Sequence, residues 1–222
     1  RYMAIILILM IFPTIGFNIE ALPPSKQIDN SGTDMESVDP IVIEGNTGLE
    51  NHELVTGSGT YSDPYKIANI TIDVRNSDRG AIAIRNTTEH LLIQNIKIFA
   101  SSSAPGIYLK GLFDGQYHRM NVVMDNITVV GGMRQLYLDY TEAVKLRNSN
   151  FSNPSGSGYN TYVIRSTTIS FKNNSYNAPW QWIYFYRTPN VRFEQNSGVI
   201  YGLNSNYFRY YEVWNNTFHT RR

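Results

Sequence analysis

Apolar and polar residues alternate along most of the chain after residue 40, which is the period of a β-strand rather than a helix. Between Tyr65 and Phe218 a short phrase recurs: apolar, any, apolar, any, Asn, any, any, then usually apolar. Its fifth position is Asn, or once Gln, in Asn69, Asn95, Asn126, Asn148, Asn173, Gln195 and Asn215. A repeat of roughly 20–30 residues predicts stacked supersecondary units.

The fifth position of the phrase lies between two strand-like segments, so the chain is expected to bend there. Asn tolerates the left-handed backbone conformation better than other non-glycine residues. If successive bends lie one above another at the spacing of neighbouring strands, about 4.8 Å, the amides can bond to each other as an inward-facing ladder. We therefore assign the seven residues a structural role, because buried amides of this kind are already hydrogen-bonded.

A further strand is predicted before the later phrases, each with two inward residues. These strands and their inward residues are Ala81–Arg85 (Ile82, Ile84), Gly106–Lys110 (Ile107, Leu109), Gln135–Asp139 (Leu136, Leu138), Thr161–Arg165 (Tyr162, Ile164) and Trp182–Tyr186 (Ile183, Phe185). Three strands per turn predict an all-β, single-stranded parallel β-helix of about seven coils. A β-sandwich is the alternative, but it does not require Asn at one register in successive units. Helix is not expected after residue 40, because no long stretch keeps a 3.6-residue apolar period.

The N-terminal region differs in composition from the rest. Residues 1–22 contain a short apolar run interrupted by Pro13, which predicts a signal peptide, with an uncleaved membrane anchor as the alternative. Residues 23–40 are polar and without periodicity, so we predict a disordered linker, followed by the β-helix domain over residues 41–222. Both interpretations of residues 1–22 predict a secreted or cell-surface protein. Because the chain opens on Arg1 and stops just after the last phrase, we expect it to be truncated at the C-terminus.

Composition narrows the expected partners. The formal net charge is +1, so no global field attracts nucleic acid, and contact with a membrane is expected only through the N-terminal segment. Cysteine is absent, which excludes disulfides, thiolate catalysis and cysteine metal sites. The sequence does not determine the oligomeric state.

One stretch is more distinctive than the repeat itself. Gly57-Ser-Gly-Thr-Tyr-Ser-Asp-Pro-Tyr-Lys-Ile67, which leads into Asn69, resembles the start of the β-helix in secreted NosD-like repeat proteins, common in archaea. The segment from Ile84 to Asn95 is similar to a coil of the same family, and the resemblance covers about residues 41–218. It implies a right-handed solenoid like that of pectate lyases, with sugar binding or processing as the commonest role. For NosD itself it implies copper delivery to a periplasmic enzyme.

The chain departs from these relatives where their chemistry is concerned. Polygalacturonase-type relatives carry paired catalytic aspartates, and the coils contain no adjacent acidic pair. Calcium-dependent lyase relatives need clustered carboxylates, whereas Asp114, Asp125 and Asp139 are scattered. The histidines are isolated, so copper lacks a ligand pair at suitable spacing. No metal site is predicted, no cofactor is evident, and Ca²⁺ is without support.

The outward positions of the third strand form columns when the strands are aligned by their inward residues. The columns read Ala83, Tyr108, Tyr137, Val163, Tyr184; then Arg85, Lys110, Asp139, Arg165, Tyr186; and Ala81, Gly106, Gln135, Thr161, Trp182. Aromatic rings can cover the apolar faces of sugars, and Arg or Lys can bind carboxylates or sulfates. The alternative is that Tyr simply suits exposed strands.

We therefore predict a protein that binds a polysaccharide or cell-surface glycan, an acidic one being expected. The predicted stacking residues are Tyr108, Tyr137, Trp182, Tyr184 and Tyr186, and the predicted cations for acidic groups are Arg85, Lys110 and Arg165.

A second hypothesis is a lyase acting on uronic-acid polymers, which needs a base and a cation beside the uronic carboxylate. Lys110 and Arg165, with Asp139 between them, are the best available catalytic set, although such columns also occur as solvated ion pairs. A third hypothesis is a structural surface repeat or a NosD-like copper-delivery accessory. Whether the chain is an enzyme stays open at this point.

Overall fold

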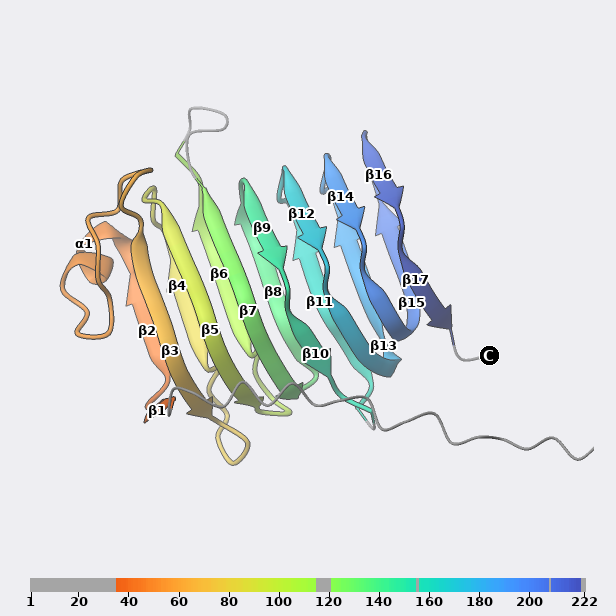
Figure 1. Ribbon diagram of the computed structural model, residues 1–222, viewed down its shortest axis with the longest axis horizontal. Helices are drawn as coiled ribbons and strands as arrows, with labels where there is room; N and C mark the ends of the chain where they lie inside the picture. Colours follow the sequence, from red (N-terminus) through yellow and green to blue (C-terminus); the bar gives the residue numbers. More distant parts are fainter. Residues whose placement is uncertain (1–34, 115–120, 155, 208, 221–222) are drawn as a thin grey trace, which may run out of the picture. The chain divides into compact units, whose positions relative to one another are not determined.

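Parallel strand pairing dominates the computed structural model, which describes residues 35–114, 121–154, 156–207 and 209–220 (Figure 1). Every pairing between its named strands is parallel, and each strand pairs with an equivalent strand of the next repeat. This confirms the prediction of a nearly all-β chain with a long parallel sheet, and it excludes the antiparallel β-sandwich. The predicted signal peptide or anchor and most of the predicted linker lie outside the described residues.

The strands form three rows. The first row follows the phrase up to its Asn and contains β3 (Tyr65–Asp73), β5 (Leu91–Ala100), β7 (Val122–Gly131), β9 (Val144–Arg147), β12 (Ile169–Lys172), β14 (Val191–Glu194) and β16 (Tyr211–Trp214). The second row follows that Asn and contains β1 (Glu36–Val38), the later parts of β3, β5 and β7, β10 (Asn150–Ser152), the first part of β13 (Ser175–Tyr186) and of β15 (Ser197–Asn206), and β17 (Thr217–Thr220).

The third row is the predicted third strand and carries most of the aromatic surface. It contains β2 (Ile41–Glu44), β4 (Ile82–Arg85), β6 (Ile107–Leu112), β8 (Arg134–Thr141), β11 (Gly158–Ile164) and the later parts of β13 and β15. Figure 1 shows successive strands of each row side by side, with α1 (Gly45–Glu50) at one end of the stack and β16 and β17 at the other.

The core lies between the rows and changes character along the stack. Early repeats bury aliphatic side chains such as Ile67 and Ile93. Later repeats bury aromatic rings at the equivalent positions, and the rings of Phe171 and Phe193 stack with centroids 4.7 Å apart. Burial of such side chains is the main stabilising term, at about 25 cal/mol per Å² of apolar surface.

The predicted bend at the fifth phrase position is left-handed at every Asn and at Gln195, with φ from 52° to 59°. Asn95 donates to Asn69 (2.9 Å) and Asn126 donates to Asn95 (3.0 Å). The chain of amides is then interrupted, because Asn148 donates to Asp125 instead of to Asn126. The expectation that these side chains face inward is wrong: all but the half-buried Asn95 are exposed. Their backbone turns outward at the bend, so the amides bond along the surface.

A second amide ladder, which the sequence analysis missed, lies one residue further on and is buried. Asn174 donates through Nδ2 to Oδ1 of Asn196, and Asn196 donates in the same way to Asn216, both at 2.9 Å. The backbone N–H of Ser149 donates to Oδ1 of Asn174, which extends the ladder by one repeat towards the N-terminus. Ile70, Ile96 and Ile127 hold the same position in earlier repeats. The doublets Asn173-Asn174 and Asn215-Asn216 were the signal for this inner ladder.

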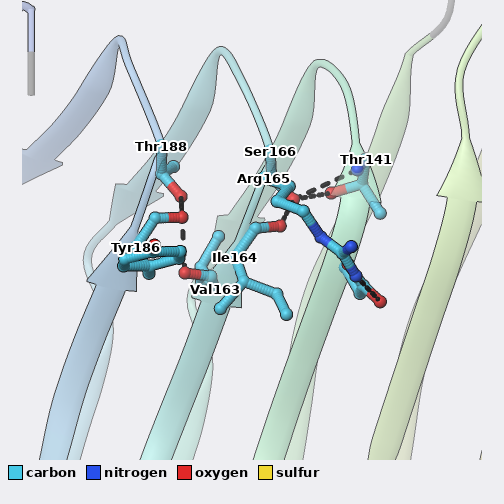
Figure 2. A network of polar contacts seen from close by, with 8 residues as sticks. Thr141, Val163, Ile164, Arg165, Ser166, Tyr186 and Thr188 are labelled. Atoms are coloured by element: carbon cyan, nitrogen blue, oxygen red, sulfur yellow. Dashed lines mark hydrogen bonds and ion pairs between the residues drawn. The ribbon is translucent and has the colours of Figure 1, made fainter. Parts of the chain in front are cut away.

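A second bend, after the third row, is also left-handed and recurs in the described repeats. Its residues are Asn86, Gly111, Tyr140, Arg165, Arg187 and Tyr207, with φ from 49° to 66°. Thr141, Ser166 and Thr188 follow three of these positions and point their hydroxyls inward (Figure 2). Thr141 donates its backbone N–H to the hydroxyl of Ser166 (3.1 Å), so hydroxyls replace amides as the inner partners at this bend.

Two elements near the start differ from prediction. β1 lies inside residues 23–40, the predicted linker, because Glu36–Val38 pairs in parallel with the outer edge of β3. The helix α1 (Gly45–Glu50) was not expected after residue 40; it is too short to show a helical period and buries Leu49 against the first repeat. Both elements cover strands that would otherwise have an unpaired edge. No helix in the described ranges has the length and apolar character needed to cross a membrane.

Candidate functional site

The outward face of the third row differs from prediction at β11. Val163 and Thr161 are buried, whereas Tyr162 faces outward in register with Tyr137 and Tyr184. The predicted alignment is therefore wrong by one residue at this strand. The cause is a break in the alternation of β11: Asn160 and Thr161 are both buried, so Thr161 and Val163 face inward in place of Tyr162 and Ile164. The pairing of β11 with β8 keeps one register throughout, and only the pairing of β11 with β13 has a register shift, between Tyr159 and Thr161.

The corrected register changes all three columns. Tyr162 replaces Val163 between Tyr137 and Tyr184, and Ile164 replaces Arg165 between Asp139 and Tyr186. In the third column Thr161 and Gln135 are buried, and Trp182 is instead in register with Tyr159, which pairs with Arg134. Arg134, Tyr159 and Tyr162 are thus site residues that sequence reasoning missed. Strict alternation misses them because two consecutive residues are buried in each strand, Gln135 and Leu136 in β8 and Asn160 and Thr161 in β11.

Four tyrosines on successive strands form what we call the tyrosine row: Tyr108, Tyr137, Tyr162 and Tyr184. Successive ring centroids are 4.8, 5.1 and 5.1 Å apart. The rings of Tyr162 and Tyr184 are stacked, with planes inclined by 11°. Because the rings contact one another, the row presents mainly ring edges and hydroxyls to a ligand, not open ring faces. This differs from the stacking role predicted for Tyr108, Tyr137 and Tyr184.

Burial affects the ionisation of three tyrosines of the row. Desolvation raises the pKa of Tyr108, Tyr137 and Tyr162 above the ordinary tyrosine value, and the nearby negative charge of Asp139 adds to the effect. The phenols therefore stay neutral at physiological pH and can donate hydrogen bonds. A raised pKa also makes them poor general bases.

Open aromatic surface gathers beside the row in a shallow depression of about 690 Å³, which we call the aromatic depression. Its lining is Ser157, Gly158, Tyr159, Trp180, Trp182 and Tyr201. Trp182 and Tyr201 meet edge to face, with ring centroids 4.7 Å apart. Tyr159 joins the depression to the tyrosine row, because its ring centroid lies 4.9 Å from that of Tyr162. Tyr159 and Tyr201 were not predicted as site residues.

The predicted catalytic set lies apart from this depression, towards the C-terminal ends of β6, β8 and β11, whereas the depression lies at the start of β11. Arg165 binds Asp139 through two hydrogen bonds from Nη2, 2.6 Å to Oδ1 and 2.8 Å to Oδ2. The Asp139 side chain is only 5% exposed, and its hydrogen bonds raise the pKa of Arg165. Each charge is thus satisfied by the other. Lys110 is exposed and in register with Asp139 on the neighbouring strand.

The remaining predicted residues occupy two places. The guanidinium of Arg85 lies over Tyr108, 5.4 Å from the ring centroid, at the far end of the tyrosine row from the depression. Tyr186 is half-buried and meets Tyr207 edge to face. The structure therefore brings Trp182 into the depression, keeps Tyr108, Tyr137 and Tyr184 in one row, and does not bring Arg85, Lys110 or Arg165 to the same point. Among the described residues no cluster of three or more acidic or histidine side chains could hold a metal ion.

Comparisons of this chain with protein-family models, with curated proteins and with solved structures found no match.

Proposed function

We propose that this chain is an exported glycan-binding protein, built as a right-handed parallel β-helix, that holds a sugar ring in the aromatic depression. The observation that carries the proposal is the convergence of Tyr159, Trp180, Trp182 and Tyr201 on one open hollow. Trp180 is 44% exposed and Tyr201 43% exposed, and large aromatic side chains so exposed at one place are typical of a binding surface.

The β-helix part of the proposal is supported by the repeat and its pairing. Strands separated by one full repeat are parallel neighbours in all three rows, and bends recur at equivalent positions. A parallel connection between strands of one sheet is nearly always right-handed. The pectate-lyase-like resemblance of Gly57–Ile67 points the same way.

A sugar fits the chemistry of the depression better than a purely apolar ligand does. Its ring carries C–H groups that pack on aromatic faces, while its hydroxyls need hydrogen-bonding partners. The lining supplies both, because Ser157 and the backbone of Gly158 lie beside the four aromatic side chains. The neutral phenols of the neighbouring tyrosine row add further donors along the same face.

Binding to a glycan array, followed by titration monitored through tryptophan fluorescence, tests the proposal. The chain has three tryptophans, so Trp182→Ala and Tyr201→Ala report on the depression and Trp214→Ala serves as the matched control. Trp214 belongs to the first row, where Arg192 lies over its ring. We expect the first two variants to weaken binding by at least about tenfold and Trp214→Ala to leave it unchanged.

Two results contradict the proposal: the absence of glycan binding by the folded wild type, or equal loss of binding in all three variants. The lyase hypothesis has no comparable support, because Arg165 and Asp139 neutralise each other and lie away from the depression. Incubation with polyuronates, followed by the absorbance of the unsaturated product, would reveal lyase activity directly. No observation favours copper delivery.

A further inference from the structure

We infer that Arg134 makes the aromatic depression selective for acidic sugars, by binding a carboxylate or sulfate on the glycan held there. The inference rests on the proposed function and adds to it the residue that reads the ligand's charge. It replaces Arg85, Lys110 and Arg165 in that role, since none of them lies at the depression.

Strand register places Arg134 next to the depression. Arg134 on β8 is the parallel partner of Tyr159 on β11, and Tyr159 is the partner of Trp182 on β13. The three residues thus occupy one row on consecutive strands, and neighbouring strands are about 4.8 Å apart. A sugar ring resting on Tyr159 and Trp182 would carry its substituents within reach of the Arg134 side chain.

No carboxylate of the described residues neutralises the charge of Arg134. Five ion pairs join other described residues: Arg75–Asp73, Arg147–Asp125, Arg165–Asp139, Lys172–Glu194 and Arg192–Glu212. The Nε of Arg134 is buried and has no hydrogen-bond partner in the same part of the chain. A half-buried guanidinium without a carboxylate is costly, and an anionic ligand on the exposed part of the side chain would supply the missing countercharge.

Two aromatic rings hold the guanidinium in place. Its central carbon lies 5.7 Å from the ring centroids of both Tyr137 and Tyr162. Cation–π contacts of this kind restrict the planar group before a ligand arrives. A guanidinium with restricted rotation presents its paired N–H groups to a carboxylate or sulfate at a lower entropic cost. The tyrosine row therefore acts as a support for the cation.

The experiment compares acidic glycans with their neutral counterparts. Oligogalacturonides are titrated against the same oligosaccharides after carboxyl reduction, and a sulfated galactan against its desulfated form. The proteins are wild type, Arg134→Gln, Arg134→Lys and the control Arg85→Gln, which removes another arginine that lies over a tyrosine. Circular dichroism and urea unfolding confirm that each variant folds.

For the acidic ligand that binds, carboxylate or sulfate, we expect Arg134→Gln to lower affinity about tenfold or more and to flatten the salt dependence. Arg134→Lys should retain part of the affinity, while Arg85→Gln and all titrations with neutral glycans should be unaffected. Equal wild-type affinity for acidic and neutral forms, or unchanged acidic binding in Arg134→Gln, overturns the inference and leaves the proposed function standing. Absence of any Trp182-dependent glycan binding overturns the proposed function itself.

Discussion

The indole of Trp182 lies against the backbone of Gly202 on the neighbouring strand. A Cβ added at Gly202 would be 2.6 Å from Cζ3 of Trp182 and 3.0 Å from Cε3, closer than carbon atoms approach in proteins. The two residues are register partners on β13 and β15. The absence of a side chain at position 202 therefore lets the indole meet the Tyr201 ring edge to face, in the position that shapes the aromatic depression.

Replacement of Gly202 by Ala should displace Trp182 and weaken glycan binding by roughly tenfold. The free energy of unfolding should change by no more than about 1 kcal/mol, because alanine suits a strand at least as well as glycine. Near-ultraviolet circular dichroism and tryptophan fluorescence would report the displaced indole. Asn204→Ala, an exposed change on the same strand, is the control. Unaltered spectra and affinity in Gly202→Ala would show that the indole does not depend on this contact.

The buried amide ladder should contribute far more to stability than the exposed one. Asn196→Ala removes the donor to Asn216 and to the carbonyl of Phe171. It also leaves the backbone N–H of Asn174 without its acceptor and removes one of the two acceptors of Asn174 Nδ2, which keeps its bond to the carbonyl of Leu146. Unpaired buried groups of this kind cost about 2–4 kcal/mol in total.

The neighbouring change Gln195→Ala alters an exposed side chain at a bend and should cost within about 0.5 kcal/mol. Urea unfolding of the two variants gives the comparison directly. Equal losses of unfolding free energy would contradict the assignment of the inner ladder as the structural one.

Arg165 should matter for stability and not for ligand binding. Arg165→Gln leaves the carboxylate of Asp139 buried without its partner, so the urea midpoint should fall further than in Arg75→Gln, whose ion pair with Asp73 is on the surface. Asp139→Asn combined with Arg165→Gln should recover part of the loss. Glycan affinity should stay at the wild-type value in both variants. A specific loss of binding or of activity on uronates would restore the catalytic interpretation of this pair.

The tyrosine row predicts a defined alkaline response. Because burial raises the pKa of Tyr108, Tyr137 and Tyr162 above the ordinary value of 10.0, these phenols keep their protons in the folded state when the unfolded chain has begun to lose them. Their stabilising contribution is complete below the unfolded pKa and is lost as the pH rises through the folded pKa. The tyrosinate absorbance of these residues should therefore appear only at a pH above the ordinary tyrosine pKa, and the free energy of unfolding should fall over the same pH range.

Triple replacement of these residues by phenylalanine tests that response. In the triple variant the absorbance increase at pH values above the ordinary tyrosine pKa should be smaller. The increase near the ordinary tyrosine pKa, which comes from the other tyrosines, should be unchanged. A smaller absorbance increase near pH 10, the ordinary tyrosine value, with the increase at higher pH unchanged, would contradict the raised pKa of these three tyrosines.

Much of the fold could be predicted because the repeat is local and periodic. Alternation specified strands, and the recurring Asn specified the left-handed bend between the first and second rows, as at Asn69 and Asn215. The second bend was harder to recognise, because Arg165 and Tyr140 adopt the same backbone conformation without being typical of it. There the inward hydroxyls of Thr141 and Ser166 supply the partners that a typical turn residue would otherwise provide.

The candidate site could be predicted only in part. Tyr108, Tyr137 and Tyr184 follow from strict alternation and were placed in the correct row. Tyr162 and Tyr159 were not, because two consecutive buried residues, Asn160 and Thr161, interrupt the alternation between them. Strict alternation cannot show that such an interruption occurs. A one-residue shift moves every side chain to the opposite face, which is why Val163 was placed outside.

By itself the sequence determined the all-β, parallel, repeating architecture and the location of its aromatic surface, because these depend on patterns within short segments. Only the tertiary structure decided which Asn residues are buried, that Arg165 is neutralised by Asp139, and that Tyr159, Trp182 and Tyr201 meet beside Arg134, which forms no ion pair with the described residues. Those relationships join residues that are 19 or more positions apart in the chain, and they depend on register, bulges and side-chain contacts between neighbouring repeats.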